Sequence, residues 1–99
     1  MPGLNDTIFA LATPPGRSAI AVIRISGGSA HRAAAAFGAV APAPGQFRLA
    51  RLKDGDGQTV DEALLLAMAA PLSSTGEDVL EIHCHGSSAV VQGLLQQLP

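Results

Sequence analysis

The sequence is poor in the large side chains that usually anchor a hydrophobic core. It contains no tryptophan and no tyrosine, and phenylalanine occurs only three times among its 99 residues. Much of the 47% apolar content is alanine, whose small side chain buries little area. A chain of this length forms at most one domain, and folding buries roughly 60–65% of the surface that the unfolded chain exposes. We therefore expect one domain over residues 1–99 with a thin core, which dimerisation or a further segment completes.

Basic clusters and long apolar runs are also missing. Six Lys and Arg residues are scattered among eight Asp and Glu residues, and the net charge is −2. This pattern lacks the basic footprint of a phosphate-binding surface, so direct nucleic-acid binding by this chain is disfavoured. The longest apolar runs, such as residues 63–72, are too short to span a bilayer, and no membrane partner is expected.

Cysteine occurs once, and Cys84 cannot form an internal disulfide. Together with the lack of a signal-peptide pattern at the start, the single cysteine favours a reducing, cytoplasmic location. The chain ends at Leu98-Pro99, directly after a helical pattern. We therefore expect the domain to be truncated at its C-terminal end within a longer protein.

Apolar periodicity and turn signals predict five strands and two helices. The expected strands lie near residues 7–11, 19–25, 47–53, 60–69 and 78–85, and the expected helices over residues 30–37 and 87–98. Ser29 is the expected N-cap and Gly38 the expected end of the first helix. Asp54-Gly55-Asp56-Gly57 predicts a tight hairpin, Pro71 to Gly76 a polar loop, and Ser87 or Ser88 the cap of the last helix. The order β-β-α-β-β-β-α predicts an α+β fold with a mixed β-sheet, or alternatively an antiparallel one, and two packed helices.

A charged residue, Arg24, lies in an otherwise apolar strand. Period-two alternation places it with Ile20 and Val22 on one face, while the opposite face is also apolar. This pattern predicts a central strand covered on both sides. Because a buried charge without a partner is costly, Arg24 is expected to meet a carboxylate. That carboxylate belongs either to a ligand or to the protein itself, with Glu81 as the internal candidate.

The second charged strand contains Glu81, His83, Cys84 and His85. Glu81 either accepts hydrogen bonds from N–H groups of a ligand or pairs with Arg24. Glu81, His83 and His85 share a face, but consecutive same-face side chains on one strand rarely converge around a metal ion, so no metal site is expected. Cys84 faces the other way as a buried apolar filler. No catalytic residues stand out, and these residues alone predict a small-ligand-binding or assembly domain.

Several motifs along the chain resemble those of the N-terminal domain of the MnmE/TrmE family of tRNA modification GTPases. The resemblance covers essentially the whole sequence, and its most specific blocks are Thr13-Pro14-Pro15-Gly16-Arg17 and Thr75-Gly76-Glu77-Asp78. The other matching blocks, in family order, are Asp6-Thr7-Ile8, Ile23-Arg24-Ile25-Ser26-Gly27, Asp54-Gly55-Asp56-Gly57, Val79-Leu80-Glu81 and His85-Gly86.

The resemblance implies a domain that binds a tetrahydrofolate derivative, 5-formyl-tetrahydrofolate, and forms a homodimer. Arg24 and Glu81 match the family's folate-contacting positions. The implied fold is a β2-α-β3-α unit, half of the folate-binding fold of the glycine-cleavage T protein. In the family's longer proteins, helical and GTPase domains use GTP, Mg²⁺ and K⁺. With the partner MnmG (GidA), those proteins modify carbon 5 of the wobble uridine in tRNA.

Three positions depart from the family pattern and leave more than one hypothesis open. Ser18 and Ser87 occupy positions where the family commonly has glycine, and Ser74 occupies one that is often aromatic. The first hypothesis is folate binding by Arg24 and Glu81. The second is a purely structural dimerisation module with a vestigial ligand pocket, and the third is a metal-dependent enzyme that uses Glu81, His83 and His85.

Overall fold

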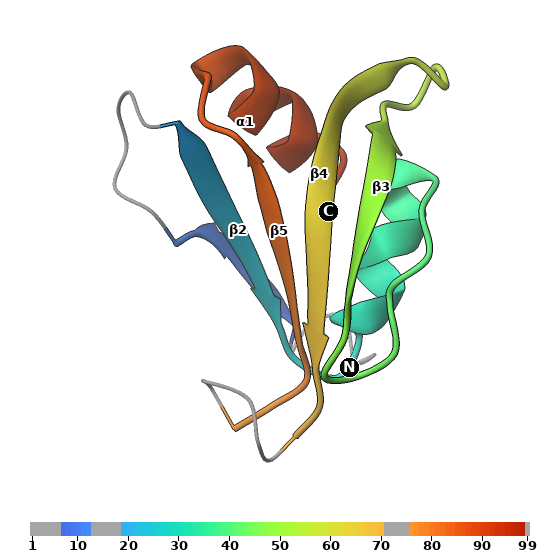
Figure 1. The fold of residues 1–99 in the computed structure, drawn as a ribbon, viewed down its shortest axis with the longest axis vertical. Coiled ribbons are helices and arrows are strands. Elements are labelled where there is room, and N and C mark those ends of the chain that lie inside the picture. The colour runs from blue at the N-terminus through green and yellow to red at the C-terminus, as the bar shows by residue number, and fades with distance from the viewer. Residues whose placement is uncertain (1–6, 13–18, 71–75, 99) are drawn as a thin grey trace.

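The computed structural model describes residues 7–12, 19–70 and 76–98, which form a small α+β domain. The strands are β1 (Ile8–Leu11), β2 (Ile20–Ser26), β3 (Phe47–Lys53), β4 (Thr59–Met68) and β5 (Val79–His85), and the helices are η2 (His31–Phe37) and α1 (Ser88–Leu95). The strands form one sheet in the order β1-β2-β5-β4-β3 (Figure 1). The predicted element order is therefore confirmed.

Every strand pair among the described residues is antiparallel, so the predicted mixed sheet is wrong. The segment that contains η2 carries the chain from β2 to the far edge of the sheet, where β3 begins. From there β3, β4 and β5 follow one another as sequential antiparallel neighbours, and β5 closes the sheet against β2. No pair needs the long crossover that a parallel arrangement requires.

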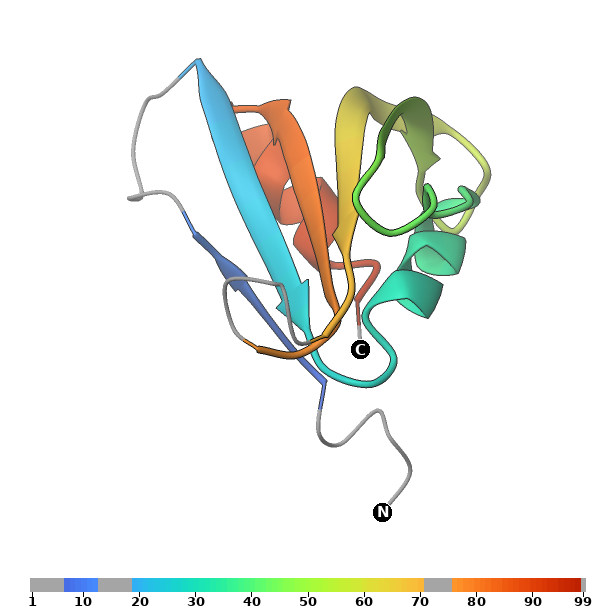
Figure 2. The ribbon, with the colours of Figure 1, turned by 60° about the horizontal axis from the view of Figure 1, so that its bottom comes forward.

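Both helices pack on the same face of the sheet, and the core lies between them and the strands. Figure 2 shows α1 behind β2 and β5, and η2 at the opposite end near β3. The sheet contributes aliphatic side chains, and Phe37 of η2 is the largest fully buried side chain. The main buried residues are Ile23, Ile25, Phe37, Leu52, Leu65, Leu80, Ile82 and Leu94.

Among the described residues, no helix or further strand covers the other face of the sheet, here called the open face. Its exposed apolar side chains include Ile8 (67% exposed), Ile20 (57%), Phe47 (70%) and Leu49 (65%). The prediction that β2 is covered on both sides is therefore wrong. β2 does lie inside the sheet, between β1 and β5, but two short helices cover only one face. From the strand register, the open face comprises Ile8, Ala10, Ile20, Val22, Arg24, Ser26, Phe47, Leu49, Arg51, Glu62, Leu64, Leu66, Met68, Val79, Glu81, His83 and His85, of which Ser26 and Val79 are buried.

The alanine-rich segment forms a 3₁₀ helix instead of the predicted α-helix. Its N-cap is Ala30, which makes no side-chain cap, whereas the Ser29 hydroxyl accepts a hydrogen bond from Arg32 Nη2 at 3.0 Å. In a 3₁₀ helix, side chains three residues apart are eclipsed, which turns His31, Ala34 and Phe37 to one side. Ala34 and Phe37 are buried there. The predicted end at Gly38 is confirmed, with φ of 69° in the left-handed region.

The hairpin and the last cap follow the sequence prediction. Asp54 Oδ1 accepts the backbone N–H groups of Asp56 (2.9 Å) and Gln58 (3.0 Å) in the β3–β4 turn, and Gly57 has φ of 81°. Ser87 is the N-cap of α1 and accepts a hydrogen bond from Val90 N at 3.3 Å. The predicted loop at residues 71–75, and the departures Ser18 and Ser74, lie outside the described residues.

Candidate functional site

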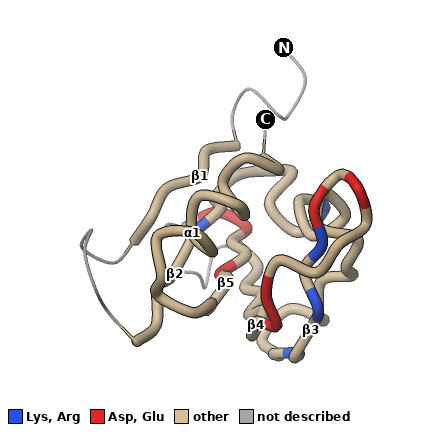
Figure 3. The backbone as a smooth tube through the Cα atoms, turned by 90° about the horizontal axis from the view of Figure 1, so that it is seen from above, with Lys and Arg blue, Asp and Glu red and all other residues tan. Residues whose placement is uncertain are grey.

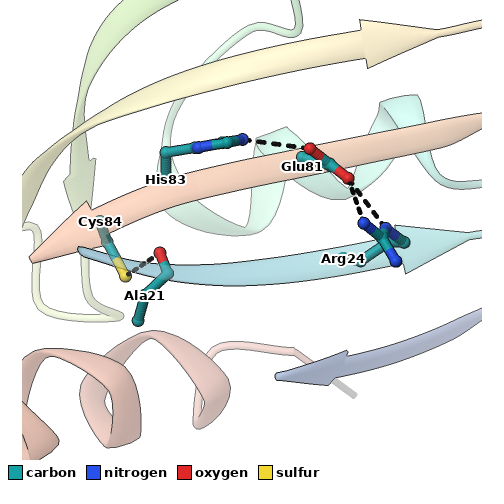
Figure 4. A network of polar contacts seen from close by, with 5 residues as sticks. All are labelled: Ala21, Arg24, Glu81, His83 and Cys84. Carbon is teal, nitrogen blue, oxygen red and sulfur yellow. Dashed lines mark hydrogen bonds and ion pairs between the residues drawn. The ribbon is translucent and has the colours of Figure 1, made fainter. Parts of the chain in front are cut away.

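Arg24 and Glu81 form an ion pair on the open face. Arg24 of β2 lies directly opposite Glu81 of β5 in the strand register. Arg24 Nε and Nη2 donate to Glu81 Oε2 at 2.8 and 2.7 Å (Figure 4). The Arg24 side chain is 38% exposed and the Glu81 side chain 14%. Of the two alternatives that the sequence left open, the structure contains the internal pair, while part of the guanidinium stays accessible.

His83 completes the network on the other oxygen of Glu81. Its Nε2 lies 3.1 Å from Glu81 Oε1 (Figure 4). A carboxylate offers about four lone-pair positions. Two hydrogen bonds from Arg24 occupy Oε2 and one from His83 occupies Oε1, which leaves about one acceptor position on Oε1. The N–H groups of Arg24 Nη1 take no part in the ion pair.

The network keeps Glu81 ionised at neutral pH. Burial alone raises the pKa of this carboxyl group, but the hydrogen bonds and positive charge of Arg24 and His83 outweigh burial. The net result is a pKa below the ordinary value of 4.5. The site therefore presents the negative carboxylate of Glu81, held by hydrogen bonds from two side chains. Beside it lies the guanidinium of Arg24, whose Nη1 N–H groups are not used in the ion pair.

Apolar side chains surround this network. Val22 precedes Arg24 on the same face of β2, and Leu66 of β4 lies opposite Glu81. Ala10 of the edge strand β1 lies opposite Arg24. A flat, partly polar molecule can lie against these side chains while its hydrogen-bonding edge meets the charged groups. Directional polar groups therefore lie inside an apolar part of the sheet face.

His85 does not join Glu81 and His83. Its Nδ1 lies 2.7 Å from Asp61 Oδ1, and its backbone N–H donates to Asp61 Oδ2 at 2.8 Å. His83 contacts Glu81, whereas His85 contacts Asp61, so the three side chains do not converge on one point. In the ranges that the structure covers, no group of three His, Cys, Asp or Glu side chains is placed to hold a metal ion. Sequence reasoning missed Asp61, although an acidic pair at the start of a largely apolar strand was the available signal.

Cys84 lies on the opposite side of β5 from Glu81, as predicted, and is buried among the core residues. Its Sγ donates to the carbonyl oxygen of Ala21 at 3.6 Å (Figure 4). Burial raises the pKa of the Cys84 thiol, and the nearby charge of Asp61 raises it further. A protonated, enclosed thiol of this kind is a core side chain and not a nucleophile.

Charged residues are concentrated away from the network. Figure 3 shows them along the β3–β4 hairpin, whereas β1 and α1 carry none. One pair there, Arg51 Nε and Glu62 Oε2, lies 3.5 Å apart with side chains 74% and 54% exposed. Among the described residues, no helix is long and apolar enough to cross a membrane.

Comparisons with known proteins identify the family of the chain. A family model described as GTP-binding protein TrmE N-terminus matches residues 7–99. A protein of Alkalilimnicola ehrlichii named tRNA modification GTPase MnmE is 51% identical over 94 residues, which are 95% of this chain and 21% of that relative. A protein of the same name from Dinoroseobacter shibae is 46% identical over 93 residues, or 94% of this chain and 22% of that relative. The chain thus spans about a fifth of the length of these relatives. It belongs to the family of MnmE/TrmE N-terminal domains, as its motifs indicated.

Proposed function

We propose that this domain binds a tetrahydrofolate one-carbon derivative, 5-formyl-tetrahydrofolate, on the open face. The observation that carries the proposal is the Arg24–Glu81–His83 network, because it places directional polar groups within an exposed apolar sheet face. Membership of the family supports the same assignment to Arg24 and Glu81.

The donor set fits the polar edge of a pterin. That ring carries N–H donors beside ring nitrogen and carbonyl acceptors. Arg24 has N–H groups for an acceptor, and Glu81 Oε1 has about one acceptor position for a donor. For Glu81 to take two N–H groups from the ring, His83 has to release Oε1. Binding therefore exchanges an internal hydrogen bond for one to the ligand.

The same face supports homodimerisation. Exposed apolar side chains from β1, β2 and β3 lie around the charged network. Two copies that meet through this face bury those side chains and enclose a ligand between two sheets. Such an arrangement corresponds to the two halves of a T-protein-like folate-binding fold, which remains part of the proposal.

Calorimetric titration with 5-formyl-tetrahydrofolate tests the ligand assignment. Arg24→Ala removes the guanidinium and leaves Glu81 with one partner, so binding is expected to weaken at least about 10-fold. Arg51→Ala is the matched control, because Arg51 is also an open-face arginine with a carboxylate partner but lies on the edge strand β3. Its affinity is expected to stay within about twofold of the unsubstituted chain. Equal affinity in all three proteins sinks the assignment.

A structural module with a vestigial pocket is the second candidate. The observation in its favour is that Glu81 already has partners on both oxygens. Sedimentation that shows a dimer, combined with no folate binding at high ligand concentration, selects this candidate.

The rest of the proposal concerns a protein about five times longer, judged from its relatives. In it, this domain serves a cytoplasmic GTPase that uses GTP, Mg²⁺ and K⁺ and modifies carbon 5 of the wobble uridine in tRNA. MnmG (GidA) and tRNA are the partners of that longer protein.

A further inference from the structure

Asp61 and His85 form a second polar site beyond the Arg24–Glu81–His83 network. The paired register of β4 and β5 ends at Leu64 and His83, and the strands diverge beyond that point (Figure 1). There the Asp61 carboxylate accepts both the backbone N–H of His85, at 2.8 Å, and its ring Nδ1–H, at 2.7 Å. The Asp61 side chain is 9% exposed, whereas the His85 side chain is 72% exposed.

This contact fixes both the tautomer and the orientation of the imidazole. An ionised carboxylate only accepts hydrogen bonds, so Nδ1 of His85 carries a proton. The buried carboxylate then holds the ring, and Nε2 is the nitrogen left for another molecule. No described residue contacts Nε2. A carboxylate-held, exposed imidazole is a prepared hydrogen-bonding group, whose Nε2 accepts in the neutral ring and donates to an anion once it carries a proton.

His85 is aligned with the first site along β5. Alternation along the strand places Glu81, His83 and His85 on the open face, opposite Arg24, Val22 and Ile20 of β2, respectively. Four residues of extended strand separate Glu81 from His85, about 13 Å at roughly 3.3 Å per residue. On the neighbouring strand β2, Val22 lies opposite His83 and the exposed Ile20 lies opposite His85, so apolar side chains run alongside both polar sites.

We propose that His85 binds a carboxylate at the far end of an elongated ligand whose head lies at Arg24 and Glu81, with the ring taking up a proton on Nε2 so that this nitrogen donates to the carboxylate. The inference rests on the proposed function, because a tetrahydrofolate joins a pterin head to a glutamyl carboxylate through a flat benzoyl spacer. The spacer lies along Val22 and Ile20, and the glutamyl carboxylate meets the imidazole. Asp61 is a positioning residue that acts through His85.

The test compares two ligands that differ only in the tail. The 99-residue chain is titrated with 5-formyl-tetrahydrofolate and with its tail diamide, in which both glutamyl carboxylates are replaced by neutral amides. His85→Ala is expected to weaken binding of the carboxylate-bearing ligand about 10-fold, the value of one charge-assisted hydrogen bond, and to leave binding of the diamide unchanged. His85→Gln, which keeps a side-chain amide, is expected to restore part of the loss. Arg51→Ala serves again as the control.

The results separate this inference from the function on which it rests. If His85→Ala weakens the binding of both ligands equally, His85 has a purely structural role and the inference is overturned. The inference is also overturned if His85→Ala weakens the binding of neither ligand. In both cases the loss of binding in Arg24→Ala preserves the proposed function. If the unsubstituted chain binds neither ligand, the proposed function and the inference fall together.

Discussion

At the scale of single residues, the Arg24–Glu81–His83 network couples stability to pH. The folded state lowers the pKa of Glu81 below 4.5, so folding favours the ionised carboxylate. A group of this kind contributes stability that is fully present above its unfolded pKa and is lost as pH falls through the folded pKa. The contribution of Glu81 is therefore fully present at neutral pH, begins to decrease near pH 4.5 and is lost as pH falls through the lower pKa of the folded state.

We expect Glu81→Gln to lower the free energy of unfolding by about 1–2 kcal/mol at pH 7, because charged hydrogen bonds are replaced by neutral ones. The gap between the two proteins should narrow as pH falls from 4.5 through the lower pKa of Glu81 in the folded state, because protonation removes the charge that distinguishes Glu81 from glutamine. Urea denaturation at pH 7 and at pH 3.5 measures this difference. Glu62→Gln is the control, because the exposed Glu62 pair is worth at most about 1 kcal/mol. An equal gap at both pH values contradicts the prediction.

Sequence alternation identified which charged side chains share a face, but not which partner each one selects. Period two alone places Glu81 and Cys84 on opposite sides of β5 and groups Arg24 with Ile20 and Val22 on one side of β2. The choice between a ligand and an internal partner depends on the register of two strands whose paired residues lie 57 positions apart. Asp61 escaped notice for a similar reason, because its contact with His85 exists only where β4 and β5 diverge.

At the scale of elements, η2 shows tertiary contacts overriding local propensity. Four consecutive alanines favour an α-helix. The observed 3₁₀ helix instead aligns Ala34 and Phe37 toward the sheet together with His31, whose Nε2 lies 2.8 Å from Met68 O and 3.1 Å from Val79 O. Those two carbonyl groups belong to the end of β4 and the start of β5. Strand positions, by contrast, followed closely from apolar alternation and turn residues, because both are local.

The contact of His31 with β4 and β5 is expected to stabilise the domain. His31→Ala leaves the Met68 and Val79 carbonyl groups without this donor, and the expected loss is about 1–2 kcal/mol of unfolding free energy. Thermal denaturation followed by circular dichroism measures the loss. Arg32→Ala is the control on the same helix, since its exposed side chain bonds only to the Ser29 hydroxyl, and its expected cost is about 0.5 kcal/mol. Equal melting temperatures for the two variants contradict the assigned role of His31.

At the scale of the whole molecule, a sheet covered on one face explains why the core is thin. The sparse large side chains of the sequence fill a single layer between the sheet and two short helices. Five large apolar side chains are more than half exposed. Three of them, Ile20, Phe47 and Leu49, lie on β2 and β3 of the open face, Ile8 lies on β1 of the same face, and Val40 lies in the connector before β3. Composition pointed to this shortage, but which face stays open depends on where η2 and α1 pack, and that is a three-dimensional property.

The proposed dimerisation through the open face can be tested by a single substitution, because a two-fold interface uses every contact residue twice. Leu49→Glu places a charge on the exposed part of β3, where Leu49 is 65% exposed and its replacement leaves the core intact. In a symmetric dimer two carboxylates are desolvated for each substitution, so the dissociation constant is expected to rise about 100-fold. Sedimentation equilibrium over a concentration series measures this change.

Val40→Glu is the matched control for the dimer. Val40 is 69% exposed, nearly the same as Leu49, but it lies in the connector between η2 and β3 and not on the open face. The two variants add the same charge to the chain, so any general effect of charge on association is common to both. A dimer that weakens only with Leu49→Glu assigns the open face as the interface. If both variants weaken the dimer equally, or if neither weakens it, the open face is not the dimer interface. Its exposed apolar side chains would then have to be covered by another partner.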